Sequence, residues 1–250
     1  ILSDYNISKE DIVITYFQDA ILHDEVFRLK KKIGFKTIAC VTEWFSDDYF
    51  SDSRRLKDYK KHFYKWLPLY DLILPISTYL EKHFKSLGCE TLRIPIMADA
   101  NEFVYIREES DKIRFIFPGN GRIKDDLKSV LRAFEQIDDY YLEKIEFHIC
   151  GMKRESIKEL MGSDNQGKIN KILVIHDWMQ YDELIDLYRR MDYLILIRSE
   201  SQITLSNFPS KVPECMTHGI VPIVSDVGDY TKLYLKNGVN SIFITENTIA

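Results

Sequence analysis

Short runs of apolar residues alternate along the chain with longer stretches in which apolar residues recur every three or four positions. The runs predict strands at residues 11–17, 36–42, 71–77 and 91–97, then at 113–118, 145–150, 172–176, 193–197, 221–225 and 241–244. Several runs lack polar alternation, which is typical of strands covered on both faces. Stretches such as 128–137 and 182–191 place their apolar residues on one face of a helix. Alternating strands and helices predict crossover units, a parallel sheet and hence an α/β fold.

The longest stretch without clear periodicity, residues 98–112, is rich in charged side chains. We therefore predict two α/β domains, at residues 1–100 and 113–250, joined by a linker at 101–112. The second has six predicted strands, enough for a complete doubly wound domain, whereas the first has only four. We expect the first domain to be incomplete.

Composition excludes several classes of protein. The chain has 250 residues, with 34 Lys and Arg against 39 Asp and Glu, and this net charge of −5 argues against a nucleic-acid binder with a broad basic surface. No apolar run approaches the roughly 18 residues that cross a bilayer. The four cysteines are far apart and form no CxxC pair, so they are expected to be reduced and buried, as in a cytosolic protein.

The loop after the predicted strand 113–118 combines flexibility with positive charge. Its sequence includes Gly119, Asn120, Gly121, Arg122 and Lys124. Ligands of parallel sheets bind at the carboxyl ends of strands, where glycines allow close approach and a following helix favours an anion. The loop therefore suits a phosphate or diphosphate, although a simple tight turn with solvated basic side chains would have the same residues. It is no dinucleotide fingerprint, because Lys124 replaces the third glycine of GxGxxG.

A second candidate segment lies at residues 208–226. Ser210 can cap a short helix, Lys211 near its start can face an anion, and Glu214 can accept hydrogen bonds from two neighbouring hydroxyls such as those of ribose. The alternative is an exposed Lys–Glu pair on a helix surface. Spacing alone does not separate the two interpretations.

The order of several motifs resembles glycosyltransferase family 4, a group 1 glycosyltransferase family. Residues 209–219 are similar to its donor-domain helix PSK-xxE-xMxxG, and residues 236–240 to its NGxNG-like hairpin. Residues 115–134 resemble its GR…K…LLxAF loop and helix, 71–88 its last acceptor-domain unit, and 94–103 its entry to the linker. These motifs are collinear over roughly three quarters of the chain.

The resemblance implies a GT-B fold, in which two Rossmann-like domains face a cleft, and a retaining transfer without a bound metal or cofactor. It assigns Arg122 and Lys124 to neutralise the donor diphosphate, with Lys128 as the alternative to Lys124, and gives Gly119, Asn120, Gly121, Ser210 and Lys211 to the same donor site. Glu214 matches the second glutamate of the family's EX7E motif. The first glutamate is replaced by Ser206.

The remaining roles also follow from the resemblance. Asp177, Trp178 and Met179 would border the nucleobase, and Thr204, Leu205 and Ser206 would form a loop over the donor sugar. Glu43, with Gln18 and Trp44, would serve the acceptor or its proton. Of the histidines, His23 lies nearest the acceptor loops, His176 near the base pocket, and His62, His83 and His148 are expected on helix surfaces or in the sheet.

The implied function is transfer of a sugar from a nucleotide-diphosphate sugar, UDP- or GDP-linked, to a saccharide or lipid-linked acceptor in bacterial polysaccharide or glycoconjugate synthesis. We expect a cytoplasmic protein, with possible peripheral membrane contact through the basic and aromatic residues 59–66. Two alternatives stay open: a non-catalytic nucleotide-sugar-binding protein, which Ser206 favours, and a GT-B sugar-nucleotide epimerase. The family also implies that the chain is truncated at both ends.

Overall fold

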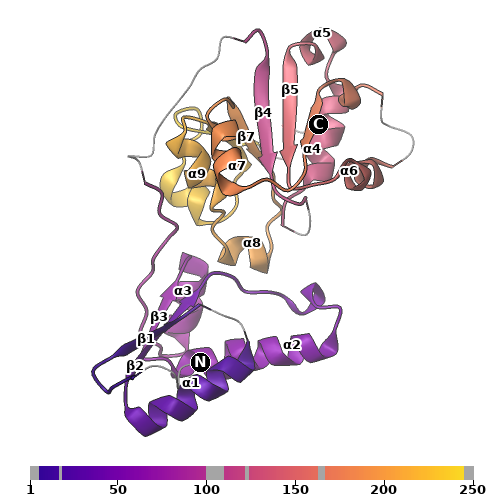
Figure 1. Cartoon of the computed structure of the whole chain (residues 1–250). Helices are drawn as coiled ribbons and strands as arrows, with labels where there is room; N and C mark the ends of the chain where they lie inside the picture. The colour runs from indigo at the N-terminus through magenta and orange to yellow at the C-terminus, as the bar shows by residue number, and fades with distance from the viewer. Residues whose placement is uncertain (1–5, 17–18, 100–109, 122–123, 163–166, 245–250) are drawn as a thin grey trace. The chain divides into compact units, whose positions relative to one another are not determined.

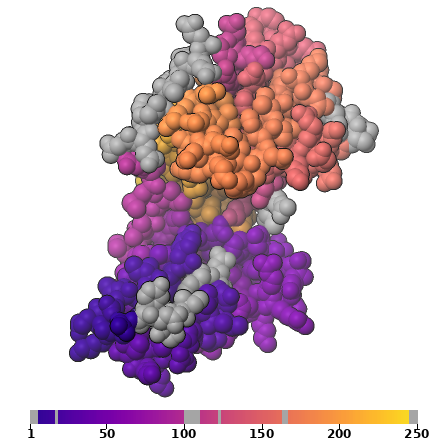
Figure 2. Space-filling view, in the orientation of Figure 1, coloured from indigo at the N-terminus to yellow at the C-terminus, as the bar shows by residue number. Residues whose placement is uncertain are grey.

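The computed structural model describes residues 6–16, 19–99, 110–121, 124–162 and 167–244. The chain divides into two compact units (Figures 1 and 2). Unit 1 is Ile1–Pro95 together with Ser201–Phe208, and unit 2 is Ile96–Glu200 together with Pro209–Ala250. By its contacts, the short segment 201–208 therefore belongs to unit 1, although the chain on both sides of it belongs to unit 2.

Unit 1 is built on a three-stranded parallel sheet in the order β1-β2-β3. Its strands are β1 (Ile12–Thr15), β2 (Lys36–Val41) and β3 (Leu72–Pro75). Its helical segments are α1 (Ala20–Ile33), η2 (Asp47–Tyr49), α2 (Ser53–Lys60), the π-helical η3 (Lys61–Trp66), η4 (Leu67–Leu69), α3 (Thr78–Ser86) and α8 (Gln202–Ser206). In Figure 1, α8 lies beside α3, with which it is in contact.

Local sequence explains the limits of α1. The Asp19 carboxylate accepts a hydrogen bond from the Ile21 N–H at 3.0 Å, which satisfies one of the unpaired amides of the first turn. Gly34 ends the helix in the left-handed conformation, at φ 92°, and donates its N–H to the Lys30 carbonyl. Between these caps, Val26 and Leu29 are buried against Phe35 and anchor the helix on the sheet.

Nine of the ten predicted strands form, and the exception is residues 91–97. There the chain runs beside β3, but only one bridge, between Thr91 and Ile73, meets the criterion for pairing. The amides of Leu92 and Ile94 donate to the carbonyls of Ile73 and Pro75. The ladder stops because Pro75 of β3 has no N–H to donate to the Leu92 carbonyl, which is its next rung.

Unit 2 contains a six-stranded, all-parallel sheet in the order β6-β5-β4-β7-β8-β9. Its strands are β4 (Ile113–Pro118), β5 (Ile145–Cys150), β6 (Leu173–His176), β7 (Tyr193–Leu196), β8 (Val221–Ser225) and β9 (Ile242–Ile244). Its helical segments are α4 (Leu127–Gln136), α5 (Asp139–Leu142), α6 (Arg154–Met161), η6 (Ile169–Lys171), α7 (Tyr181–Tyr188), α9 (Lys211–Thr217) and the π-helical η7 (Tyr230–Tyr234). The predicted α/β class and parallel sheets are confirmed.

The strand order of unit 2 reverses its direction at one point of the sheet. Counted from its first strand, the order in unit 2 is 3-2-1-4-5-6, so the direction of winding reverses between β4 and β7. Loops diverge at such a switch point, and open α/β sheets bind ligands there, at the carboxyl ends of the strands. The loops after β4 and β7 are therefore the first place to look for a site.

A continuous apolar core holds these loops in position. On one side of the sheet, Leu127, Leu131 and Phe134 of α4 are buried against Phe117 of β4 and Phe147 of β5. Asp126 caps α4, because its carboxylate accepts both the Ser129 N–H at 3.0 Å and the Ser129 hydroxyl at 2.6 Å. Helix α4 therefore begins directly after Asp126, within one residue of the predicted helical stretch 128–137.

Candidate functional site

The carboxyl ends of four neighbouring strands of unit 2, β6, β5, β4 and β7, are linked by main-chain hydrogen bonds. The Gly119 N–H, after β4, donates to the Cys150 carbonyl at 2.9 Å, and the Gly151 N–H, after β5, donates to the His176 carbonyl at 3.1 Å. On the other side of β4, the Asp126 N–H donates to the Ile197 carbonyl at 2.8 Å, next to the end of β7. The edge around the switch point is therefore a connected rim.

A buried ionic cluster lies in this rim. Asp125 accepts a hydrogen bond at 2.7 Å from Arg198 Nε through Oδ1 and another at 2.8 Å from Lys211 Nζ through Oδ2. The side chains of Arg198, Asp125 and Lys211 are 3%, 9% and 17% exposed. Asp125 follows β4, Arg198 follows β7 and Lys211 begins α9, so the fold brings together three distant parts of the sequence.

The charges of this cluster are unequal. Burial opposes ionisation of Asp125, but the ammonium of Lys211 and the guanidinium of Arg198 outweigh it and lower the pKa of the carboxyl below its ordinary 3.8. Burial lowers the pKa of the Lys211 ammonium, and Asp125 opposes that shift. One carboxylate thus faces two cations, so a further anion beside them would be stabilised.

Lys211 Nζ lies directly against the glycine loop. A Cβ added at Gly119 would be 2.9 Å from Lys211 Nζ and 3.5 Å from Asp125 Oδ2. The glycine therefore allows the ammonium to approach the main chain. At Gly121 the requirement is conformational, since its φ is +57° and a Cβ there would meet Leu127 at 3.0 Å.

The structure places the predicted phosphate ligands unevenly. Lys211 is a member of the ionic cluster, Gly119 lies against it, and Gly121 lies next to Leu127 and Met152. Asn120 is an exposed residue of the same loop. Lys124 is half-buried directly before Asp125, whereas Lys128 is exposed on the first turn of α4. Arg122 lies outside the described residues. The choice between Lys124 and Lys128 stays a prediction.

Helix α9 carries the two remaining donor-site candidates. Glu214 is half-buried one turn after Lys211, and among the described residues none hydrogen bonds to its carboxylate. It is thus available to hydroxyl groups. Ser210 occupies the N-cap position with helical φ and ψ and forms no side-chain capping bond, so the prediction that it caps the helix is wrong. Its exposed hydroxyl lies next to Lys211 in sequence.

The predicted nucleobase segment follows β6. Trp178 is 76% exposed, so its indole is neither in the core nor packed on the surface. Asp177 is also exposed, Met179 is half-buried, and the Asp177 carbonyl accepts the Gly151 N–H at 3.4 Å. These residues border the connected rim through Gly151. An exposed indole here offers a face on which a planar base can stack.

The predicted donor-sugar residues lie in α8, which belongs to unit 1. Thr204 and Ser206 are 1% and 0% exposed, and Leu205 is half-buried. The Thr204 hydroxyl completes a capping box with Ser201. The Ser206 hydroxyl donates to the Ile203 carbonyl at 3.2 Å and accepts the Trp44 N–H at 2.9 Å.

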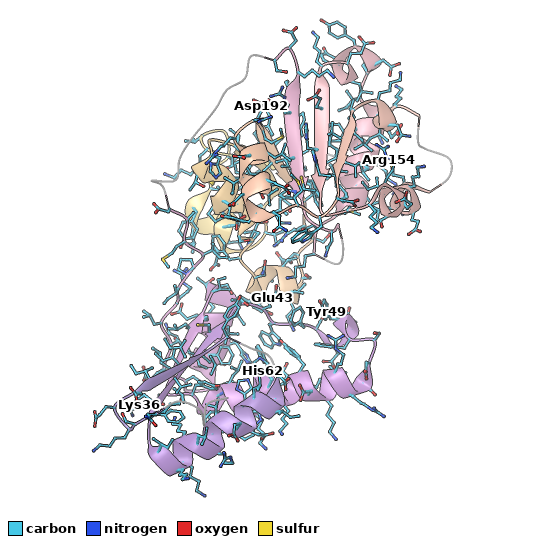
Figure 3. The ribbon with its side chains drawn as sticks, in the orientation of Figure 1. Lys36, Glu43, Tyr49, His62, Arg154 and Asp192 are labelled. Carbon is cyan, nitrogen blue, oxygen red and sulfur yellow. The ribbon has the colours of Figure 1, made fainter. Side chains whose placement is uncertain are left out.

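The acceptor-side candidates follow β2 in unit 1. Figure 3 labels Lys36 and Glu43 at opposite ends of this strand. Glu43 accepts a hydrogen bond at 3.1 Å from Asn207 Nδ2. The Trp44 indole stacks on Phe63, with 4.9 Å between ring centroids, so it is an aromatic packing residue. Gln18 lies outside the described residues.

A buried polar chain lies at the carboxyl end of β1. His23 Nε2 and His62 Nδ1 are 2.6 Å apart, His23 Nδ1 and Tyr70 Oη are 2.8 Å apart, and the Thr15 hydroxyl donates to Tyr70 Oη at 3.1 Å. Burial lowers the pKa of His23 to about 4 and that of His62 to about 3. The prediction of His62 as a helix-surface residue is wrong, because η3 turns it into unit 1 (Figure 3).

A second histidine pair joins β5 to β6. His148 Nδ1 and His176 Nε2 are 3.0 Å apart, and burial lowers the pKa of His148 to about 4. His148 is thus a sheet residue, as predicted. The described residues include no group of three His, Cys, Asp or Glu side chains arranged to hold a metal ion. None of the described helices is both long and apolar enough to cross a membrane.

Sequence reasoning missed three residues of the ionic cluster and its support: Asp125, Arg198 and Ser225. Asp125 was not among the predicted site residues, yet it is the centre of the cluster. Arg198 directly follows a buried apolar run, and a charge at the end of a buried strand was the available signal. The Ser225 hydroxyl bonds to the main chain of Arg198, and a contact with main-chain atoms leaves no mark in the sequence.

Comparisons with known proteins extend this description. Residues 100–250 match the model of a family described as glycosyl transferases group 1. None of the curated proteins matches the chain.

Several solved structures share the fold at low sequence identity. The apo form of the lipopolysaccharide outer core galactosyltransferase WaaB is 18% identical, with a TM-score of 0.58 over 96% of this chain and 63% of that one. The pneumococcal O-GlcNAc transferase GtfA in complex with UDP and GlcNAc is 13% identical, with a TM-score of 0.69 over 98% and 48%. Anabaena Alr3699/HepE in complex with UDP-glucose is 14% identical, with a TM-score of 0.66 over 94% and 65%. This chain thus spans about half to two thirds of their length.

Proposed function

Since the chain belongs to the group 1 glycosyltransferases, we propose that it binds a nucleotide-diphosphate sugar in unit 2 and transfers the sugar to a saccharide or lipid-linked acceptor. Its partial GT-B fold is consistent with this reaction. The single observation that carries the proposal is the ionic cluster of Asp125, Arg198 and Lys211 at the switch point, beside Gly119.

The cluster suits the departing group of the reaction. When the bond between the sugar and the diphosphate breaks, negative charge grows on the leaving phosphate oxygens. Lys211 and Arg198 provide two fixed cations for one carboxylate, in a site with little water. Preorganised charges stabilise such a transition state without reorganising during the reaction. Lys124 and Arg122 add positive charge from the glycine loop, and no metal is needed for this role.

The nucleoside would extend along the rim from the cluster. Glu214, one turn from Lys211, is proposed to accept the hydroxyls of the ribose. The base, uracil or guanine, is proposed to lie near Asp177 and Met179 and to stack on the exposed indole of Trp178. The complexes of GtfA with UDP and of HepE with UDP-glucose favour uracil, because they show that proteins of this fold bind uridine diphosphates.

The acceptor is proposed to be held by unit 1, with Glu43 hydrogen bonded to its hydroxyl. In a retaining transfer, the bond from the sugar carbon to the acceptor oxygen forms on the face that the diphosphate leaves. The acceptor proton departs as that bond forms. Glu43, an ionisable group at the carboxyl end of β2, is the candidate for orienting the hydroxyl or receiving its proton.

Calorimetric titration with UDP, GDP and ADP in metal-free buffer tests the donor site. We expect one nucleotide to bind in the micromolar range. Arg122→Ala, Lys211→Ala and Glu214→Ala should each weaken binding by about tenfold or more, since each removes a charged contact. Lys171→Ala is the matched control, because Lys171 is exposed before β6, at the opposite edge of the sheet. Equal binding by all variants, or none by the parent chain, would contradict the donor site.

A second function is favoured by Ser206. Where the family usually has the first glutamate of EX7E, this chain has a serine whose hydroxyl is already bonded to Trp44 and Ile203. The chain could therefore bind a nucleotide sugar without transferring it. Release of the free nucleotide from a nucleotide sugar, followed with and without saccharide acceptors, separates an enzyme from a binding protein.

The proposed membrane contact would use α2 and η3. Their exposed cations include Arg54, Arg55, Lys57, Lys60 and Lys65, and Tyr64 is 50% exposed. Tyr59 and Phe63 are buried, so the face is more basic than aromatic. Anionic lipid attracts such a face. Sedimentation with phosphatidylserine vesicles, but not with phosphatidylcholine vesicles, would support contact with the inner face of the membrane, and a location there stays a prediction.

A further inference from the structure

We propose that Asn207 is a positioning residue that holds the Glu43 carboxylate in one orientation, ready to accept a hydrogen bond from an acceptor hydroxyl. This inference rests on the proposed function, because it assigns Glu43 to the acceptor. It identifies the short segment 201–208 as part of the acceptor site. The segment lies far from β2 in the sequence, and the motifs had assigned it to the donor.

Asn207 and Glu43 are joined directly by a hydrogen bond between their side chains. Asn207 Nδ2 donates to Glu43 Oε1 at 3.1 Å, and both residues are half-buried. A carboxylate without such a partner would choose among several rotamers, at an entropic cost on binding. An amide donor also favours the ionised form of the acid that accepts from it.

The main chain on both sides of this contact is fixed as well. Ser206, next to Asn207, accepts the Trp44 N–H at 2.9 Å, and the Ser206 carbonyl accepts the Ser77 hydroxyl at 2.8 Å. Ser206 and Ser77 are both fully buried. Consecutive residues 206 and 207 therefore bind consecutive residues 44 and 43. This arrangement sets the register of α8 on unit 1, so that the Asn207 amide meets Glu43.

Trp44 is immobilised by its ring. Its centroid is 4.1 Å from that of His83 and 4.9 Å from that of Phe63, and its Nε1 donates to Tyr64 Oη at 3.2 Å. On the far side, the Phe45 N–H donates to Tyr59 Oη at 2.9 Å. The backbone at 43–45 is thus rigid. The Asn207 hydrogen bond then restricts the rotamers of the Glu43 side chain.

The segment is also tied to the donor site through the chain itself. It leaves unit 2 just after Arg198 and returns just before Lys211, and both of these cations bind Asp125. The residues that position Glu43 therefore lie between two ligands of the proposed diphosphate site. Nothing in the Asn207 contact depends on that site being occupied, which allows the two proposals to be tested separately.

The test is carbon-detected NMR at neutral pH of the chain labelled at its glutamate carboxyl carbons, with the Glu43 signal assigned from Glu43→Gln. In Asn207→Ala we expect the Glu43 carboxyl signal to change its chemical shift and to broaden, because the carboxylate loses the Asn207 donor and samples more rotamers. Asn207→Asp, in which a second carboxylate replaces the amide donor, should also displace the signal.

Gln202→Glu is the matched control, since it adds the same charge at the other end of α8. Its Glu43 carboxyl signal should coincide with that of the parent chain. Far-ultraviolet circular dichroism confirms that each variant is folded. In an acceptor-dependent assay, Asn207→Ala should lower kcat with little change in the nucleotide affinity measured by calorimetry, and should have no further effect in the Glu43→Gln background.

The results separate this inference from the proposed function. An unchanged Glu43 carboxyl signal in both Asn207 variants overturns the positioning role, even if the chain binds a nucleotide. A displaced signal in a chain that binds no nucleotide supports the Asn207–Glu43 relationship and overturns the proposed function. A signal that moves equally in Gln202→Glu shows that the effect is not specific to Asn207, and it too overturns the inference.

Discussion

Ser225 and Arg198 are joined by two hydrogen bonds of opposite direction. The Arg198 N–H donates to Ser225 Oγ at 2.8 Å, and the same hydroxyl donates to the Arg198 carbonyl at 2.7 Å. One side chain at the end of β8 thus satisfies both polar groups of a residue that follows β7. The Arg198 guanidinium is therefore positioned both by the hydrogen-bonded backbone of Arg198 and by its own ion pair with Asp125.

Ser225→Ala should therefore disturb the position of Arg198 while leaving the charged side chains of the cluster unchanged. The variant loses the two hydrogen bonds to the Arg198 amide and carbonyl, and we expect the free energy of unfolding to fall by about 1–3 kcal/mol. Urea denaturation measures this change. Nucleotide affinity should fall too, because Arg198 is no longer fixed, whereas Ser225→Thr, which keeps the hydroxyl, should fall less on both measures.

Asp125→Ala should lower the stability of the chain, and an added anion should restore part of that stability. It leaves Arg198 and Lys211 buried without a counter-charge, for which we expect a cost of about 3–5 kcal/mol. An anion that enters the site would replace the missing carboxylate. Inorganic pyrophosphate should therefore raise the melting temperature of Asp125→Ala by more than it raises that of the parent chain. Equal shifts in the two proteins would mean that pyrophosphate binds elsewhere.

Gly119→Ala should weaken nucleotide binding specifically. The new methyl group would lie 2.9 Å from Lys211 Nζ, so the ammonium must move away from Asp125 and from the loop. We expect about a tenfold loss of affinity by calorimetry. Gly167→Ala is the matched control, because a Cβ there meets nothing within 4 Å and its φ is not in the left-handed region. That variant should bind as the parent chain does.

Acid should destabilise the chain through His23 and His62. Their folded pKa values, about 4 and about 3, lie below the ordinary 6.5, so between those limits the unfolded chain binds more protons than the folded one. The contribution of these two histidines to the free energy of unfolding is therefore present in full above about pH 6.5 and is lost as pH falls toward 4. Each histidine contributes a slope of up to about 1.4 kcal/mol per pH unit.

Urea denaturation of the parent chain and of His62→Gln at several pH values measures this effect. The variant should be less stable at pH 7, where the buried chain to Tyr70 is disrupted, but its stability should depend less on pH below 6.5. Lys171→Ala, far from the histidines in sequence and exposed, should keep the full dependence. A variant with the same slope as the parent would assign the acid effect to other groups.

The sequence predicted what depends on local pattern. Continuous apolar runs located β4, β5 and β8 at their observed limits, because a strand buried on both faces has a pattern that no neighbour needs to complete. The glycine loop and the helix that follows were located for the same reason. At residues 91–97 the pattern indicated a strand, but the neighbouring strand β3 ends at Pro75, whose missing N–H interrupts the ladder.

The rest depended on residues distant in the sequence. Asp125 is 86 residues from Lys211 and 73 from Arg198, and no periodicity connects them. Ser206 was assigned from a motif, yet its contacts are with Trp44 and Ser77. His62 was misplaced because a π-helical turn rotates it inward, and spacing of 3.6 residues does not foresee such a turn.

The placement of residues 201–208 in unit 1 has a consequence for biosynthesis. The bonds that seat this segment span 129, 162 and 164 residues. A nascent chain that has exposed only its first hundred residues still lacks the partners of Ser77, Trp44 and Glu43. Unit 1 can then reach its final packing only after most of unit 2 has been synthesised, so the two units mature together instead of in the order of translation.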